Sequence, residues 1–214
     1  KRMPASFDWR KAQKAQREEI ESDLQFLGLI VMQNRMKHDT PSVIRKLNRS
    51  QIESIMVTGD NAFTAISVAR QCGIISQNMK IYFGEVQEDK EENKTNIVWK
   101  DIESDSLLDP VSLLPLDGVQ VGDYELAITG SVFEHLLTEH MVFKERKLEE
   151  EAKFKAEKRS KPKGWADRHS TFQRMLVMSH IYARMSPDQK LILSEQLQEL
   201  GYFVGFCGDG ANDC

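Results

Sequence analysis

The chain has 214 residues, which is enough for one substantial hydrophobic core or for one domain and the edge of another. Its formal charge of −4 argues against a general nucleic-acid-binding surface, which would need a basic stripe. Three cysteines without paired spacing indicate reduced thiols, and neither a disulfide framework nor a zinc site. The longest apolar runs fall far short of the roughly 20 residues of a membrane helix, and no signal-peptide pattern is present, so a soluble, cytosolic segment is expected.

The N-terminal part of the chain predicts a helix, a strand and a boundary between domains. Strong helix formers, most of them charged, fill residues 8–23, and an apolar run at 24–32 is typical of a strand. The polar stretch 33–37 interrupts that run, so we place a hinge or domain boundary there. Beyond it, Thr40 followed by Pro41 is typical of an N-cap and the first position of a helix.

The next stretch has the order strand, polar turn, helix, which is half of a βαβ unit. An apolar run at 52–57 predicts the strand, residues 58–61 form the turn, and residues 62–72 have a helical pattern. Two more short strands are expected at 74–75 and 80–83.

The rest of the chain alternates polar connections with strands and helices. Residues 85–122 are irregular and polar, so we expect a partly ordered insertion. The mixed-charge run 144–163 predicts a solvated helix with ion pairs or a mobile loop, with no ligand-binding role. The other expected elements are a strand at 125–128, a helix starting at Thr129, a helix at 169–179, a strand at 180–184, a helix at 189–200 capped by Ser186, and a buried strand at 202–207.

Polar residues follow three of these strands at the turn into the next helix. They are Thr58, Gly59 and Asp60 after the first strand, Arg184 and Lys190 after the second, and Asp209 and Asp213 after the third. Because the carboxyl ends of parallel strands share one edge of a sheet, we expect these turns to lie together. The Thr58 hydroxyl and the Gly59 N–H can donate to phosphoryl oxygens, and Lys190 supplies a positive charge. Asp209 and Asp213 are the hard oxygen ligands that suit Mg²⁺.

Each turn also has a simpler explanation when it is taken alone. The first could be only a turn, with Asp60 capping the following helix. Arg184 and Lys190 could be exposed surface charges. The glycines and aspartate at 208–210 could close a hairpin, with Asp213 as a helix N-cap. The order of the three turns and their shared place in the topology favour a functional site.

The combination of MVTGDN at 56–61, YARMSPDQK at 182–190 and CGDGANDC at 207–214 resembles the phosphorylation domain of P-type ATPases. These enzymes belong to the haloacid dehalogenase-like superfamily. With DLQFLGLIVMQNRMK at 23–37, the spelling is similar to the type V class, subgroup B. Members of that subgroup are membrane pumps of endosomes and lysosomes, and several of them are linked to polyamine transport.

The resemblance implies an α/β fold, namely a haloacid dehalogenase-like Rossmannoid parallel sheet with helices on both faces, incomplete and with insertions. It implies that residues 1–33 are the C-terminal end of the nucleotide-binding domain and that residues 34–214 are the phosphorylation domain. Variable insertions are expected at about 76–123 and 141–168.

The resemblance also assigns roles to eight residues. The catalytic ones, which contact or neutralise the phosphoryl group, are Thr58, Gly59, Lys190 and Asn212. Those near the ATP ribose and the hinge are Asp60 and Arg184, and those that hold Mg²⁺ are Asp209 and Asp213.

By this resemblance, the chain is part of the catalytic core of an ATP-driven transporter of polyamines or cations, with ATP and Mg²⁺ as cofactors and no nucleic-acid partner. ATP would phosphorylate an aspartate in a longer protein, of which this chain is a piece. That aspartate's motif, D-K-T-G-T, does not occur in these 214 residues. The chain alone is therefore expected to be inactive, with one unpaired edge in its sheet.

Two other interpretations stay open. A soluble haloacid dehalogenase-like phosphatase would use the same chemistry at the sheet edge, although the stretch 23–37 and the spelling of 182–190 argue against it. A catalytically dead, truncated regulatory module would fit the missing nucleophile. The sequence that precedes Lys1 would distinguish the three possibilities.

Overall fold

The computed structural model describes residues 3, 7–30, 35–89, 94–118, 123–165 and 168–208. Its contacts divide the chain into two compact units, Lys1–Arg35 and Met36–Cys214, each of which is considered by itself. No helix in the described ranges is both long enough and apolar enough to cross a membrane.

In the first unit, the stretch predicted as one helix contains two single-turn helices, α1 (Trp9–Ala12) and α2 (Arg17–Ile20). None of their residues is buried, and such short helices have little stability without packing against a core. The strand predicted at 24–32 is also wrong where it is described, because residues 24–30 form none. Leu27 in this stretch is 93% exposed, so the apolar run has no surface to cover it here.

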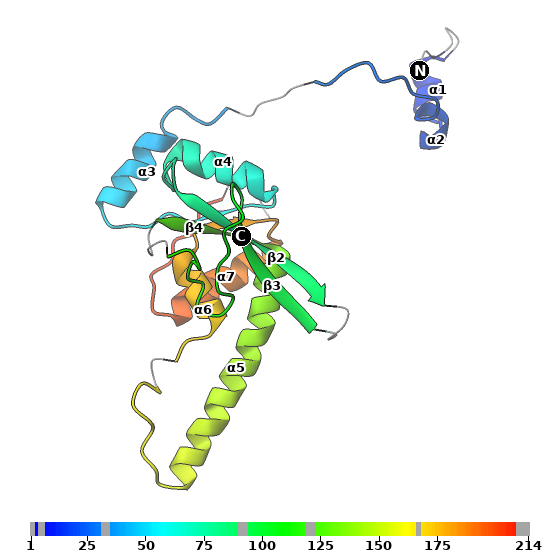
Figure 1. Cartoon of the computed structure of the whole chain (residues 1–214). Helices are drawn as coiled ribbons and strands as arrows, with labels where there is room; N and C mark the ends of the chain where they lie inside the picture. Colours follow the sequence, from blue (N-terminus) through cyan, green and yellow to red (C-terminus); the bar gives the residue numbers. More distant parts are fainter. Residues whose placement is uncertain are drawn as a thin grey trace. The chain divides into compact units, whose positions relative to one another are not determined.

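The second unit is built on a mixed sheet with the strand order β1-β5-β4-β2-β3 (Figure 1). The strands are β1 (Met56–Val57), β2 (Lys80–Asp89), β3 (Lys94–Asp101), β4 (Tyr124–Thr129) and β5 (Ile181–Ala183). Neighbouring strands are parallel from β1 to β2, and β3 alone runs antiparallel, against β2. The strands predicted at 80–83, 125–128 and 180–184 take part in this sheet, and of the strand predicted at 52–57 only Met56–Val57 forms.

The helices of this unit begin and end near the signals in the sequence. They are α3 (Thr40–Arg49), α4 (Ala62–Cys72), α5 (Gly130–Ala156), α6 (Thr171–Met178) and α7 (Pro187–Glu199). Ser170 and Ser186 cap α6 and α7 through capping boxes with Gln173 and Gln189. The N-cap of α3 is Asp39 rather than the predicted Thr40, so the boundary was wrong by one residue.

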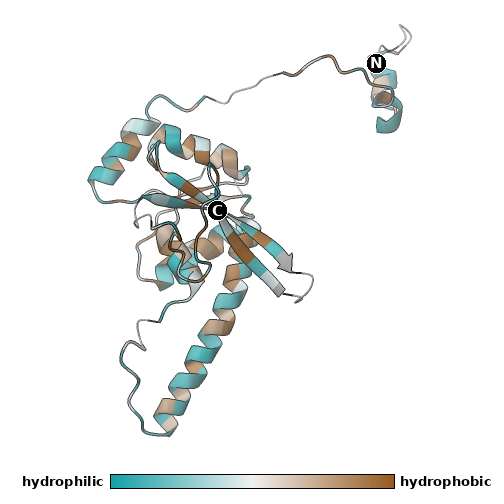
Figure 2. Ribbon diagram, viewed as in Figure 1, coloured by the Kyte–Doolittle hydropathy of each residue, from teal (hydrophilic) through white to brown (hydrophobic). Residues whose placement is uncertain are grey.

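Helices cover both faces of the sheet, as predicted, and a separate apolar core lies on each face. Alternation along β4 sends Ala127 to one core, with Ala65 of α4, and Leu126 to the other, with Phe133 of α5 and Phe172 of α6. Figure 2 shows that apolar and hydrophilic residues are mixed along the helices of this unit. The predicted α/β class is therefore confirmed, with an antiparallel edge strand added to the parallel sheet.

The insertion is more regular than predicted. Residues 85–89 continue β2 beyond the parallel sheet, and 94–101 return beside it as β3. In this hairpin Gly84 pairs with Trp99. The Trp99 ring packs over Gly84 so closely that a Cβ at this position would lie 2.8 Å from it. Lys, Glu and Asn residues hid this strand pattern in the sequence. A strand predicted at 74–75 does not form, because these residues leave α4 in a turn after Gly73, which has φ 83°.

The buried strand predicted at 202–207 is wrong in this structure. These residues form no ladder, Phe203 is fully exposed, and Phe206 is 45% exposed. Only Val204 packs partly against the core formed by α5, α6 and α7. Strand β1 is the edge of the sheet and has only β5 as a neighbour. A strand forms only beside a partner, and residues 202–207 pair with no strand that the structure describes.

Candidate functional site

The turns that follow β1 and β5 are joined by backbone hydrogen bonds. Thr58 donates its N–H to the Tyr182 carbonyl at 2.9 Å, which extends the pairing of the two strands by one step. Arg184 donates its N–H to the Asp60 carbonyl at 2.9 Å, and Met185 donates to the Thr58 carbonyl at 3.0 Å. The two turns predicted to meet at one edge of the sheet are therefore in direct contact.

A third turn, between β4 and α5, closes onto the same place through Gly130. A Cβ on this glycine would lie 2.5 Å from the Arg184 carbonyl oxygen and 2.6 Å from Gln189 Oε1. The Gln189 amide donates to the Gly130 carbonyl at 3.0 Å. Gly130 and Gln189 received no site role from the sequence, although the Thr129-Gly130-Ser131 signal after a strand marked the turn. They hold the three turns in register.

Thr58 and Gly59 provide a hydroxyl group and an exposed glycine backbone at the turn after β1. Thr58 Oγ1 accepts the Asp60 N–H at 3.1 Å, which leaves the hydroxyl hydrogen to donate elsewhere. Gly59 is exposed, and no atom lies within 4 Å of the position that a Cβ would take. A phosphoryl group fits the chemistry of this pair, because it needs hydrogen-bond donors and a backbone that it can approach closely.

Arg184 and Lys190 lie on the second of these turns. Arg184 is exposed and has φ 52°, a left-handed conformation that is uncommon for a residue with a side chain. Lys190 is partly buried in the first turns of α7, and its N–H bonds the carbonyl of the N-cap Ser186 at 3.1 Å. Asp60 is exposed at the start of the loop into α4. These placements agree with a charged rim around the turns.

The predicted metal ligands Asp209 and Asp213, with Asn212, lie outside the described residues, so the magnesium site stays a prediction. In the ranges that are described, no group of three or more His, Cys, Asp or Glu side chains could hold a metal ion.

Comparisons with known proteins decide the family. No family model matches the chain. Vacuolar cation-transporting ATPase YPK9 of Saccharomyces cerevisiae is 39% identical over 96% of this chain and 13% of its own length. Polyamine-transporting ATPase 13A3 of Mus musculus is 34% identical over the whole chain and 16% of its own length. Probable cation-transporting ATPase 13A4 of Homo sapiens is 35% identical over 92% of the chain and 15% of its own length.

The chain belongs to the 13A family of P-type ATPases. The resemblance to the type V class is thereby confirmed. The chain spans about a sixth or less of the length of these relatives, so it corresponds to one segment of a P-type ATPase.

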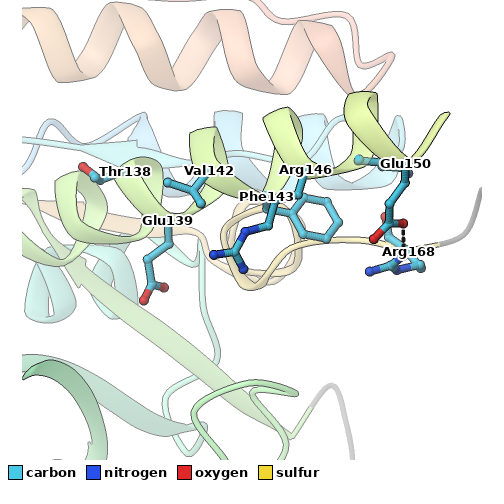
Figure 3. A pocket seen from close by; sticks show the side chains of 8 residues that line it. Thr138, Glu139, Val142, Phe143, Arg146, Glu150 and Arg168 are labelled. Carbon is cyan, nitrogen blue, oxygen red and sulfur yellow. Dashed lines mark hydrogen bonds and ion pairs between the residues drawn. The ribbon is translucent and has the colours of Figure 1, made fainter. Parts of the chain in front are cut away.

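A pocket of about 500 Å³ in this ATPase segment lies away from the three turns, along α5 (Figure 3). Its lining includes Val142, Phe143 and Arg146 of the helix, and Arg168 from the segment that precedes α6. Arg168 is bonded to Glu150 at 2.7 Å. None of the predicted site residues lines this pocket, so its size gives no support to a nucleotide site there.

At the amino ends of the parallel strands, a buried carboxylate joins the beginnings of β4 and β5. Glu125 is 2% exposed and accepts both the His180 backbone N–H at 2.7 Å and a bond from the His180 ring at 2.8 Å. This hydrogen bond raises the pKa of His180, against the effect of burial, and Glu53 at 3.8 Å adds to the rise. The pair lies at the amino ends of the strands, so we assign it a structural role.

Proposed function

We propose that this chain is the phosphorylation-domain segment of an ATP-driven membrane transporter. The observation that carries the proposal is the joining of three strand-end turns at one edge of a parallel sheet, where open space borders Gly59 beside the Thr58 hydroxyl. The sequence identities of 34–39% to the ATPases named above also support the proposal. In the whole protein, the γ-phosphate of ATP would pass to an aspartate that these 214 residues do not contain.

The chemistry that we assign to the site is positioning and electrostatic stabilisation, since charge in phosphoryl transfer spreads over three equatorial oxygens. Thr58 and Gly59 contact the phosphoryl group, and Lys190 neutralises its charge. Asp209 and Asp213 would hold Mg²⁺, with Asn212 in a supporting role, and the ion would supply positive charge to the phosphoryl group. The nucleotide's ribose would lie near Asp60 and Arg184.

We further infer two domains, with residues 1–33 ending the nucleotide-binding domain and residues 34–214 forming the phosphorylation domain. The insertions at about 76–123 and 141–168 belong to the second. The substrate class is a cation or polyamine, after the names of the relatives, and the location is an endosomal or lysosomal membrane. The yeast relative is named a vacuolar ATPase, which supports the membrane of an organelle.

Labelled ATP provides the test. In a longer protein that includes the upstream D-K-T-G-T motif, we expect a phosphoenzyme that survives acid and is released by hydroxylamine, as an acyl phosphate is. The 214-residue chain alone should acquire no such label, because it lacks the accepting aspartate. Hydroxylamine-sensitive label on the 214-residue chain would contradict the proposed division of roles. Absence of label in the longer protein, with ready hydrolysis of small phosphate esters, would support a phosphatase instead.

A further inference from the structure

The second half of α5 and the segment that follows it form a hairpin beyond the main body of the unit. The helix has 27 residues and is therefore about 40 Å long. Its fully buried residues end at His140, so the part from 141 onward carries no such residue. In Figure 1 this part extends away from the sheet, and the chain returns alongside it toward α6. None of the roles proposed for the phosphoryl site uses this hairpin.

Trp165 fastens the returning segment to the helix. Its side chain is 7% exposed, and its indole N–H donates to the Glu150 carboxylate at 3.2 Å. The ring of Phe154 meets it edge-on, with centroids 6.2 Å apart. The ammonium groups of Lys161 and Lys147 lie 4.2 and 5.1 Å from the ring centroid. These contacts hold the hairpin in one arrangement and so fix where its tip displays charge.

The tip concentrates positive charge in a chain whose net charge is −4. Between residues 152 and 164 there are six basic side chains and one acidic one, a charge of +5 that directly follows the three glutamates at 149–151. We call the six the basic tip: Lys153, Lys155, Lys158, Arg159, Lys161 and Lys163. Glu151 pairs with Lys155 and Lys161, and Glu157 pairs with Arg159. Lys158 and Lys163 form no ion pair with any residue that the structure describes, and every member of the tip is exposed.

We propose that the basic tip binds the surface of a membrane that contains anionic lipids. The proposal rests on the proposed function, which places this segment beside a membrane. A cluster of four to eight Lys and Arg residues near a membrane is the usual composition of such a surface. Five of the six are Lys, whose compact, strongly hydrated charge suits diffuse attraction, whereas bidentate recognition of one carboxylate or phosphate favours Arg.

The apolar residues of the tip favour adsorption without insertion, although Leu148, farther back along the hairpin, is 62% exposed. No large apolar side chain between 149 and 165 is strongly exposed, since Phe154 and Trp165 pack on each other. The attraction is therefore electrostatic, and it should weaken as salt shortens the Debye length from about 10 Å at 0.1 M to about 3 Å at 1 M.

Co-sedimentation of the 214-residue chain with lipid vesicles tests the proposal. We expect binding to vesicles of phosphatidylcholine mixed with phosphatidylserine, loss of that binding at high salt, and none to phosphatidylcholine alone. Each surface cation contributes a factor of roughly five to the partition coefficient. Replacing Lys158, Arg159 and Lys163 together by Gln should therefore reduce binding about a hundredfold.

The matched control removes the same charge from α3, by replacing the exposed Arg45, Lys46 and Arg49 with Gln. We expect vesicle binding within about twofold of the unchanged chain, because α3 is a separate surface. Equal losses in the two triple variants would overturn the proposal, since net charge alone would then govern binding. Equal binding to neutral and anionic vesicles would also overturn it.

A parallel arm uses soluble polyglutamate as the probe. Tip-dependent binding to polyglutamate without binding to anionic vesicles would show that the tip takes an acidic protein segment, and would overturn the lipid assignment. The vesicle assay needs no catalysis, so its result is independent of the phosphoenzyme assay. Tip-dependent binding in a protein that forms no phosphoenzyme would reject the proposed function and keep the charged surface.

Discussion

Gly59 combines two properties that separate a role in chemistry from a role in folding. Its φ is not left-handed, and no atom lies within 4 Å of a Cβ built on it. Gly59→Ala should therefore change the unfolding free energy of the 214-residue chain by no more than about 0.5 kcal/mol. In the longer protein, the added methyl group would occupy the open space beside Gly59, where we propose that the phosphoryl group binds. We expect phosphoenzyme formation to slow roughly a hundredfold, the scale for losing one preorganised donor.

Denaturant unfolding of the variant chain is the internal control for this prediction. If the variant unfolds like the unchanged chain and forms phosphoenzyme at the normal rate, Gly59 lies outside the phosphoryl site. A lower unfolding free energy would instead show that the turn depends on glycine for its conformation.

Arg184 has the backbone conformation that sequence reasoning had no means to predict. A left-handed residue with a side chain costs about 1–2 kcal/mol. Here the conformation aims the Arg184 N–H at the Asp60 carbonyl and its own carbonyl at Gly130. Such conformations persist where surrounding structure over-determines them, which is common at functional sites. In this chain the contacts at the junction of the three turns stabilise the left-handed conformation of Arg184.

At the scale of elements, the pair of Glu125 and His180 ties two parallel strands together and makes that tie depend on pH. The hydrogen bond with Glu125 raises the pKa of His180 in the folded chain above the value of about 6.5 in an unfolded one. Its contribution to stability is therefore complete below about pH 6.5 and is lost as pH rises through the folded pKa. His180→Gln should lower the unfolding free energy by about 1–3 kcal/mol in acid, since it leaves a buried carboxylate short of a partner.

Urea unfolding across about pH 5.5 to 8.5 measures this difference. The gap between the unchanged chain and His180→Gln should narrow as the pH rises. His38→Gln is the matched control, because the His38 side chain is fully exposed and its pair with Asp39 lies on the surface. A gap that is constant with pH, or that widens toward alkaline pH, would show that protonated His180 is not what stabilises the strands.

Elements with strong local signals were predictable, and elements fixed by tertiary contacts were not. Helix α7 begins at Pro187, directly after its N-cap Ser186, and Gly73 is the C-cap of α4. The hairpin of β2 and β3 was missed because its stability comes from cross-strand packing such as Trp99 over Gly84. The helix predicted at 8–23 reduced to two single turns because no core lies beneath it in its unit.

For the whole molecule, the rule for parallel sheets correctly predicted that the turns after β1 and β5 meet, whereas the third predicted turn lies outside the described residues from 209 onward. Parallel pairing of β1 and β5 is enough to bring Thr58 and Arg184 to one edge. The placement of Lys190 near that edge follows from the capped start of α7. The carboxylates at 209 and 213 lie outside the described residues, and the segment predicted as a strand before them is not paired with any strand that the structure describes. The local sequence pattern shows that this segment is apolar. Whether an apolar segment forms a strand depends on a partner strand elsewhere in the chain.

The exposed edge of β1 and the apolar segment 202–207 lead to a prediction about the longer protein. We expect the strand that carries the D-K-T-G-T motif to pair with β1 and with this segment, burying Phe203. In the 214-residue chain, where Phe203 is fully exposed, Phe203→Ala should change the unfolding free energy by less than about 0.5 kcal/mol. In the longer protein the same substitution should cost about 3–5 kcal/mol, as for a buried aromatic side chain.

Phe172→Ala is the control for that comparison, because Phe172 is 1% exposed and packs against Phe133 in the chain as it stands. It should destabilise both proteins by about 3–5 kcal/mol. Hydrogen exchange gives a second measurement, since the amides of 202–207 should exchange quickly in the short chain and slowly in the long one. Equal small effects of Phe203→Ala in both proteins, with fast exchange in both, would mean that this segment is not a strand of the sheet. The carboxylates of Asp209 and Asp213 would then have to be positioned by a segment that is not a strand.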